Sequence, residues 1–159
     1  MADERGTAPG MPSENKPDPM EVDKVLECLN AALELQHRSI LQFNLASGSM
    51  FGLEVQAVTR DLWDFAQAEL DDTRRVVEKI AALGGDPTTK VAKVTWTSDP
   101  AKTMDNLIES EDEAIAALHA VIPFSGQEPR SEALEHLMEH LIMRKQNQVD
   151  WLRRARRQP

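Results

Sequence analysis

Six polar side chains fall where the helical spacing of this sequence calls for core hydrophobes. They are three carboxylates, a lysine and two glutamines: Glu69, Asp72, Glu111, Lys145, Gln36 and Gln148. We call these six residues the polar layer. Polar groups in an apolar interior are costly unless they satisfy one another or hold a ligand. Three carboxylates can bind a divalent cation, whereas a lysine ammonium beside them forms ion pairs.

The polar layer has a definite layout. Apolar residues recur at alternating steps of three and four in four segments, which keeps them facing a bundle axis. In each segment, polar residues replace apolar ones at the middle of this apolar series. The first and third segments each contribute one, Gln36 and Glu111. The second and fourth each contribute a pair at i, i+3, which are Glu69 with Asp72 and Lys145 with Gln148. Di-metal carboxylate bundles place one Glu on each of two helices and Glu-x-x-His on the other two. The positions match that layout, although most of the residue types do not.

Four helices must position these residues, and their starts are marked in the sequence. Asp18 and Asp99 are N-cap residues, each followed by a proline suited to the first helical position. Glu21 stands in the capping-box place after Asp18. We expect helices over about 18–48, 54–83 and 100–122, and a fourth from Pro129 or Ser131 to about 156.

The connections define the fold class. Two links are short, whereas 86–98 is longer and follows the helix-ending pair Gly84-Gly85. We therefore predict an all-α, antiparallel four-helix bundle with one longer crossover between helices two and three. The bundle is expected to occupy 18–157, and 1–17, rich in Pro, Gly, Ser, Glu and Lys, is expected to be a disordered tail.

Composition excludes several classes of function. The net charge is -9; residues 144–159 hold six basic residues against one acidic residue and carry +5, which leaves -14 on the rest. An acidic body argues against nucleic acid as a main partner, and the basic end suits the negative end of a helix dipole. Cys28 is the only cysteine and no apolar run could span a membrane, so we expect a cytoplasmic protein.

Several segments resemble the ferritin-like superfamily, and bacterioferritin most of all. They cover about 20–156 and are LNAALELQHRSILQF, AELDDTRRVVEKIAALGGDP, ESEDEAIAALHAVI and QNQVDWLRR. The resemblance implies a di-iron centre at the polar layer. When the ligands of that centre are matched to this sequence, the two single Glu ligands correspond to Gln36 and Glu111. The first Glu-x-x-His pair corresponds to Glu69 and Asp72, and the second corresponds to Lys145 and Gln148.

Only Glu69 and Glu111 keep the residue types that the resemblance implies for ligands. The methionine that holds haem in bacterioferritin corresponds to Leu70, so we expect no haem. A metal-free polar core is favoured, in which Lys145 pairs with Glu69, Asp72 or Glu111 and the two glutamines donate amide hydrogen bonds. If Lys145 swings away, the three carboxylates could hold one divalent cation, such as iron, and a remodelled di-iron site is the remaining alternative.

The favoured function is therefore a structural or binding protein with a degenerate di-iron site and no catalytic residues. One alternative is an iron-binding ferroxidase or iron-storage subunit. Another is an inactive shell subunit that pairs with a second, active ferritin-like chain. These alternatives differ in metal content and in Fe(II) oxidation.

Other candidates lie outside the polar layer. His136, Glu139 and His140 match the short H-x-x-E-H zinc-protease pattern, which needs a further ligand downstream, and the plainer interpretation is a surface helix. His37 and His119 flank the seam and are expected to be partly exposed, and Cys28 reads as a small core residue. Trp63, Leu70 and Val77 form a second stripe on helix two, which could be a loose extension of the core. The resemblance favours the face of a homo-dimer or larger homo-oligomer instead, because Leu70 corresponds to the axis position in bacterioferritin.

Overall fold

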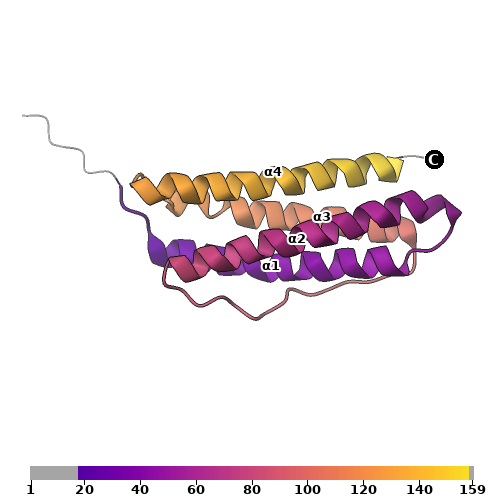
Figure 1. The fold of residues 1–159 in the computed structure, drawn as a ribbon, viewed down its shortest axis with the longest axis horizontal. Helices are drawn as coiled ribbons and strands as arrows, with labels where there is room; N and C mark the ends of the chain where they lie inside the picture. The colour runs from indigo at the N-terminus through magenta and orange to yellow at the C-terminus, as the bar shows by residue number, and fades with distance from the viewer. Residues whose placement is uncertain (1–17, 158–159) are drawn as a thin grey trace, which may run out of the picture.

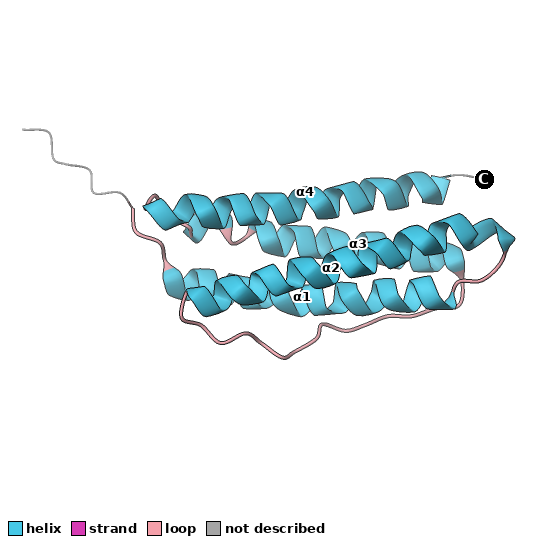
Figure 2. Cartoon of the chain, viewed as in Figure 1, coloured by secondary structure: helices cyan, strands magenta, loops and turns pink. Residues whose placement is uncertain are grey.

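The computed structural model describes residues 18–157, which form a bundle of four long α-helices. These are α1 (Val22–Ser49), α2 (Gln56–Ala82), α3 (Pro100–His119) and α4 (Pro129–Arg157), with two short 3-10 helices, η1 (Leu53–Val55) and η2 (Ile122–Phe124). No strand occurs between residues 18 and 157, so the predicted fold class is confirmed (Figures 1 and 2). The tail predicted over 1–17 lies outside the described residues.

The four helices form a square, with the interior between them. α1 lies against α2 and α3, α4 lies against α3, and α2 and α4 touch less extensively. The predicted crossover between α2 and α3 runs along the outside of α1 (Figure 2). Asn30 fixes it by donating to the Asp86 carbonyl at 3.2 Å and accepting from the Thr88 N–H at 2.8 Å. None of the helices in the described range is long and apolar enough to cross a membrane.

Two apolar clusters lie on either side of the polar layer along the bundle. One is centred on Leu33, Val76 and Leu141, and the other on Phe43, Leu62 and Leu152. All of these side chains are fully buried. The polar layer therefore interrupts a continuous hydrophobic interior, as the sequence spacing predicted.

The start of α1 differs from the prediction. The helix begins at Val22 and Glu21 is its N-cap residue without a side-chain cap bond, so Asp18 is not the cap. The preceding backbone pairs instead with the α3–α4 connection: Glu21 N–H donates to the Phe124 carbonyl at 3.0 Å, and Gln127 N–H donates to the Asp18 carbonyl at 2.7 Å. These tertiary bonds outweigh the local capping preference.

The other helix ends follow the sequence signals more closely. α2 closes in a Schellman motif, with Gly84 at φ +83° and the Gly85 N–H bonded to the Ile80 carbonyl at 2.9 Å. Asp99 caps α3 by accepting from the Ala101 N–H at 3.0 Å. α3 ends at His119, earlier than expected, since the chain turns into η2 before it reaches α4.

Gly126→Ala is expected to destabilise the fold by about 2 kcal/mol or more. Gly126 has φ +73°, and a Cβ there would lie 2.6 Å from the Pro19 carbonyl carbon and 2.7 Å from Asp18 O. Neither backbone atom can rotate away. The matched control is Gly48→Ala, where nothing lies within 4 Å of the new Cβ. Urea unfolding should show Gly48→Ala unchanged or up to about 1 kcal/mol more stable; equal stability of the two variants would contradict the account.

Candidate functional site

All six residues of the polar layer lie in the interior. Their exposed fractions range from 0% for Gln36, Glu69 and Glu111 to 5% for Gln148. α1 contributes Gln36, α3 contributes Glu111, and α2 and α4 each contribute a pair one turn apart. The helical spacing thus brings side chains from four helices to one level of the bundle.

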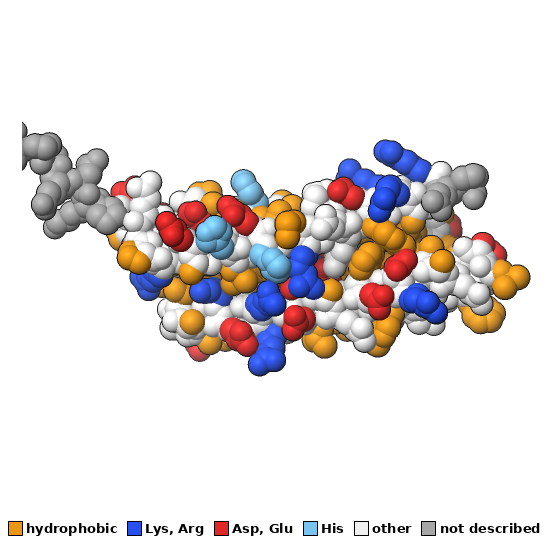
Figure 3. All heavy atoms as spheres, turned by 45° about the horizontal axis from the view of Figure 1, so that its top comes forward, with side chains coloured by type: hydrophobic (Ala, Val, Ile, Leu, Met, Phe, Trp, Pro, Cys, Tyr) orange, Lys and Arg blue, Asp and Glu red, His pale blue; other side chains and the backbone are white. Residues whose placement is uncertain are grey.

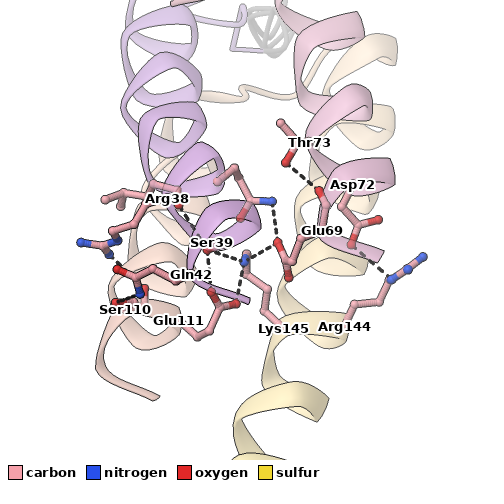
Figure 4. Close-up of polar contacts among 12 residues, drawn as sticks. Arg38, Ser39, Gln42, Glu69, Asp72, Thr73, Ser110, Glu111, Arg144 and Lys145 are labelled. Atoms are coloured by element: carbon pink, nitrogen blue, oxygen red, sulfur yellow. Dashed lines mark hydrogen bonds and ion pairs between the residues drawn. The ribbon is translucent and has the colours of Figure 1, made fainter. Parts of the chain in front are cut away.

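Lys145 is the centre of this layer. Its ammonium donates to Glu69 Oε2 at 2.8 Å and to Glu111 Oε2 at 2.7 Å, and Figure 4 shows it between the two carboxylates. The Gln36 amide donates to the same Glu69 oxygen at 3.1 Å. The Lys145 ammonium thus joins α4 to both α2 and α3, and Gln36 connects α1 to this ion pair through Glu69.

Ser39 completes the shell around the ammonium, and the sequence interpretation missed it. Its hydroxyl donates to Glu111 Oε1 at 2.5 Å, and its oxygen lies 3.4 Å from the Lys145 ammonium as an acceptor. Ser39 follows Gln36 by three residues, so it lies on the same helical face. That spacing was the signal available in the sequence, but a serine in a helix often satisfies itself on its own backbone.

A second polar contact surrounds Gln42 and Ser110, one turn further along α1. The Gln42 amide nitrogen donates to the Ser110 hydroxyl at 2.8 Å, and its oxygen accepts from the crossover's Thr95 N–H at 3.2 Å. Arg38 donates to the Ser110 carbonyl at 3.2 Å and to Glu113 at 3.0 Å. This contact links α1 and α3 beside the polar layer (Figure 4), and Thr95 adds the crossover.

Asp72 is not part of the Lys145 network. Its Oδ2 lies 3.2 Å from Nε of Arg144, but neither carboxylate oxygen accepts a hydrogen bond from a described residue, so the contact is an ion pair without hydrogen-bond alignment. Gln148 is also outside the network: its side chain makes no hydrogen bond with the residues of the described range, and its buried Oε1 has no donor. Of the three carboxylates that the sequence left open to Lys145, the structure pairs it with Glu69 and Glu111. The expectation that the Gln148 amide donates a hydrogen bond in the polar core is corrected.

Burial and charge act in opposite directions on the ion-paired groups. Burial works to lower the pKa of Lys145, but Glu111 and Glu69 outweigh it and raise that pKa, which keeps the ammonium charged. Burial raises the pKa of Glu69 to about 7 despite the attraction of Lys145. Burial likewise raises the pKa of Asp72 against the opposing effect of Arg144. One ammonium shared by two carboxylates leaves an excess negative charge, and Glu69 is the group that takes up a proton to relieve it.

Glu69→Gln is expected to remove a pH dependence of stability. Between the ordinary pKa of 4.5 and the folded value of about 7, the folded protein binds more protons than the unfolded chain. The stability that this group contributes is fully present below pH 4.5 and is lost as the pH rises through 7, a difference of about 3 kcal/mol. Because the amide mimics the neutral carboxyl, the variant should be more stable than wild type at pH 8 and match it near pH 5.

Urea unfolding of both proteins across that pH range measures the effect. The control is Glu109→Gln, which changes an exposed carboxylate on α3. Its stability should follow that of the wild type at every pH. A difference between wild type and Glu69→Gln that stays constant from pH 5 to pH 8 would contradict the assignment of the proton to Glu69.

The donor set does not fit a di-metal centre. Two of its three carboxylates already contact an ammonium, and the positions that call for histidine hold Asp72 and Gln148. A divalent ion beside Lys145 would place two cations together in a low-dielectric interior. Across residues 18–157, no group of three or more His, Cys, Asp or Glu side chains is arranged to hold a metal ion.

The family of the chain follows from a direct comparison. The model of the ferritin-like domain matches residues 26–158, most of the chain. The chain belongs to the ferritin-like family. No curated protein sequence matches it.

Three solved structures with this fold resemble the chain. A ferritin-like di-iron-carboxylate protein of Bacillus anthracis is 23% identical, with 84% of this chain and 95% of that one covered and a TM-score of 0.75. Rhodobacter capsulatus bacterioferritin is 20% identical, with 82% of each chain covered and a TM-score of 0.73. A bacterioferritin-related thioferritin of Bacteroides fragilis, a dodecamer, is 16% identical, with 86% of each covered and a TM-score of 0.76. At these identities the likeness establishes the ferritin-like fold alone.

The remaining histidine candidates of this ferritin-like chain have ordinary surroundings. His136 is exposed, with Nδ1 3.7 Å from Glu139. His140 is half-buried, and its Nε2 has no hydrogen-bond partner in the described range. His37 contacts the Lys90 carbonyl of the crossover at 2.8 Å, and His119 is exposed on α3. Among residues 18–157, the H-x-x-E-H motif therefore gathers no third metal ligand.

Proposed function

We propose that this protein is a ferritin-like subunit without a di-metal centre, in which a buried ionic network takes the place of the metal and the protein serves a structural or binding role. One observation carries the proposal: the Lys145 ammonium lies 2.7 and 2.8 Å from the two family-matching carboxylates, Glu111 and Glu69. These are the oxygens that a metal pair would need. The Lys145 ammonium already supplies the positive charge that these carboxylate oxygens would otherwise take from a metal.

The network also has a structural role. A metal centre in such a bundle cross-links helices through its ligands, and here Lys145, Glu69, Glu111 and Gln36 connect all four helices through direct contacts. A buried ion pair adds little net stability compared with well-packed apolar residues. Its contribution is to specificity, since no other register of α4 would place an ammonium between these carboxylates.

Iron loading tests the proposal. Protein produced in iron-rich medium should carry well under one iron per chain, and Fe(II) oxidation in air should run no faster than in buffer alone. Near-stoichiometric iron with repeated turnover would instead support the alternative, a ferroxidase or iron-storage subunit. A second ferritin-like chain that co-purifies and brings the oxidation with it would indicate an inactive subunit of a mixed shell.

The alternative of a single bound cation rests on a specific observation. Buried oxygens in the polar layer have no donor: Gln36 Oε1, Glu69 Oε1, Gln148 Oε1 and both oxygens of Asp72. Unpaired buried acceptors favour a positively charged or donating ligand. Binding of one ion per chain that Asp72→Asn abolishes, without any Fe(II) oxidation, would support this second candidate.

We also propose that the chain forms a homo-dimer through α2. Trp63 and Leu70 are 48% and 61% exposed, and Val77, half-buried, extends the same stripe. The dodecameric assembly of the Bacteroides fragilis relative supports self-association of this fold. Sedimentation at micromolar concentration should show at least a dimer for the wild type, and Leu70→Asp should remove the contact through α2 and leave smaller species. A monomeric wild type would contradict the dimer.

A further inference from the structure

One end of the bundle presents two large apolar side chains to solvent. Phe51 and Leu53 lie in the α1–α2 connection and are 97% and 87% exposed, more than any other large hydrophobic residue that the structure describes. The connection is nevertheless held in place, because Val55 is buried and its N–H donates to the Gly52 carbonyl at 3.2 Å. Figure 3 shows hydrophobic side chains at the tip of this end. An apolar pair that an anchored connection holds in water is typical of a contact surface.

The side chains beside this tip are basic. Four arginines lie in the last turns of α4, and Figure 3 shows Lys or Arg side chains over this end of the helix. Arg153 and Arg156 bind carboxylates of α3 at 2.8 and 3.0 Å. Arg154 and Arg157 are exposed, make no ion pair in the range 18–157, and share one face of α4 at a spacing of three. Two cations beside the apolar pair are therefore free to bind an anionic partner. We call Phe51, Leu53, Arg154 and Arg157 the apolar-basic end.

The charge of the molecule is divided along the bundle. Segments 50–60, 99–105 and 150–157 meet at this end (Figure 1) and hold six basic residues against four acidic ones, which leaves -11 on the rest of the chain. The 29 residues of α4 span about 44 Å. That length is several times the Debye length of about 8 Å at physiological ionic strength. The acidic remainder therefore extends away from an anionic surface that this end touches, and salt screens its repulsion.

We propose that the apolar-basic end binds the surface of an anionic lipid bilayer, with Phe51 and Leu53 inserted below the headgroups and Arg154 and Arg157 on headgroup phosphates. Protruding side chains that are almost wholly exposed fit an apolar phase that deforms around them, whereas a folded partner would need a matching pocket. Arginine binds phosphate through paired hydrogen bonds. Reversible binding of a protein to a bilayer combines buried apolar area with attraction to anionic lipids, and this end supplies both.

A groove beside the tip supports the same occupant. It lies between the start of α2 and the end of α4, and its lining includes Val58, Asp61, Trp151 and Arg154. Trp151 is half-buried there. Tryptophan is enriched where lipid meets water, because its ring is apolar and its N–H is polar. The contact is peripheral and needs no membrane-spanning helix, and it shares no residue with the polar layer.

Flotation of the full-length protein with lipid vesicles tests the proposal. The wild type should bind vesicles of phosphatidylcholine mixed with phosphatidylglycerol, bind them less at high salt, and fail to bind phosphatidylcholine alone. Phe51→Ser with Leu53→Ser should weaken binding about 30-fold or more, because two inserted apolar side chains are lost. Arg154→Gln with Arg157→Gln should weaken it about 10-fold. Neither pair of substitutions should alter the circular dichroism spectrum, since all four side chains are exposed.

The matched control is Lys90→Gln with Lys93→Gln, which removes the same charge from exposed positions on the crossover and should leave vesicle binding unchanged. The proposal is overturned if the wild type does not bind the anionic vesicles, if the serine variant binds them as the wild type does, or if the arginine variant loses no more binding than the lysine control. It is also overturned if the serine substitutions break up an assembly of several chains and no vesicles bind, because the tip is then a contact between proteins.

Discussion

Lys145→Ala is expected to destabilise the folded protein by about 3–5 kcal/mol at pH 8. The substitution removes the cation between Glu69 and Glu111 and leaves two carboxylates buried without a counter-charge. The cost should shrink as the pH falls, because Lys145 lowers the pKa of Glu69 against the effect of burial, and without the ammonium the buried carboxyl takes up a proton more readily. Urea unfolding at pH 8 and pH 5, with a chelator present, measures both effects.

Two controls separate charge from packing. Arg144→Ala removes the half-buried partner of Asp72 and should cost less, since Arg144 reaches solvent. Lys145→Met with Glu69→Gln and Glu111→Gln removes the whole charge set at similar volume and should recover most of the lost stability. If Lys145→Ala were as stable as the wild type without added metal, the ion-pair account of the polar layer would be wrong.

Restoring the family's ligand types is expected to turn the polar layer into a metal site. The variant combines Gln36→Glu, Asp72→His, Lys145→Glu and Gln148→His, and so supplies the Glu and Glu-x-x-His set of di-metal bundles. It should bind about two divalent ions per chain, whereas the wild type is expected to bind none in this layer. Metal analysis after equilibration with Zn²⁺ and desalting gives the stoichiometry.

The informative control keeps the lysine. Gln36→Glu, Asp72→His and Gln148→His with Lys145 unchanged should bind far less metal, because the ammonium still lies between Glu69 and Glu111. Equal stoichiometry with and without Lys145 would mean that the lysine does not exclude metal. In that case, the absence of metal from the wild-type site would be due to the loss of the other ligands alone.

Much of the fold could be predicted because the helical spacing is regular. The 3-4 alternation places Leu33, Val76 and Leu141 in the interior, and the same alternation places Lys145 there although it is charged. The start of α1 could not be predicted, since Asp18 and Glu21 satisfy local capping rules but bond to residues more than 100 positions away. Local signals do not report such distant partners.

The site was predictable in its positions and less so in its contacts. Spacing alone predicts that the six polar residues lie at one level of the bundle, but it does not predict which carboxylate the Lys145 ammonium contacts. Asp72 lies one turn beyond Glu69 and reaches Arg144 at the bundle edge, so Lys145 contacts Glu69 and Glu111 instead. Ser39 shares the network because its side chain reaches Glu111 across α1 and α3, which depends on how closely the helices pack.

The most direct measurement is an anomalous-difference map at the iron edge from crystals of the wild-type protein equilibrated with Fe(II) without oxygen. The account predicts no iron peak in the polar layer and an ordered Lys145 side chain with Nζ 2.7–2.8 Å from Glu69 and Glu111. An iron peak between those two carboxylates, with Lys145 swung away from them, would contradict it.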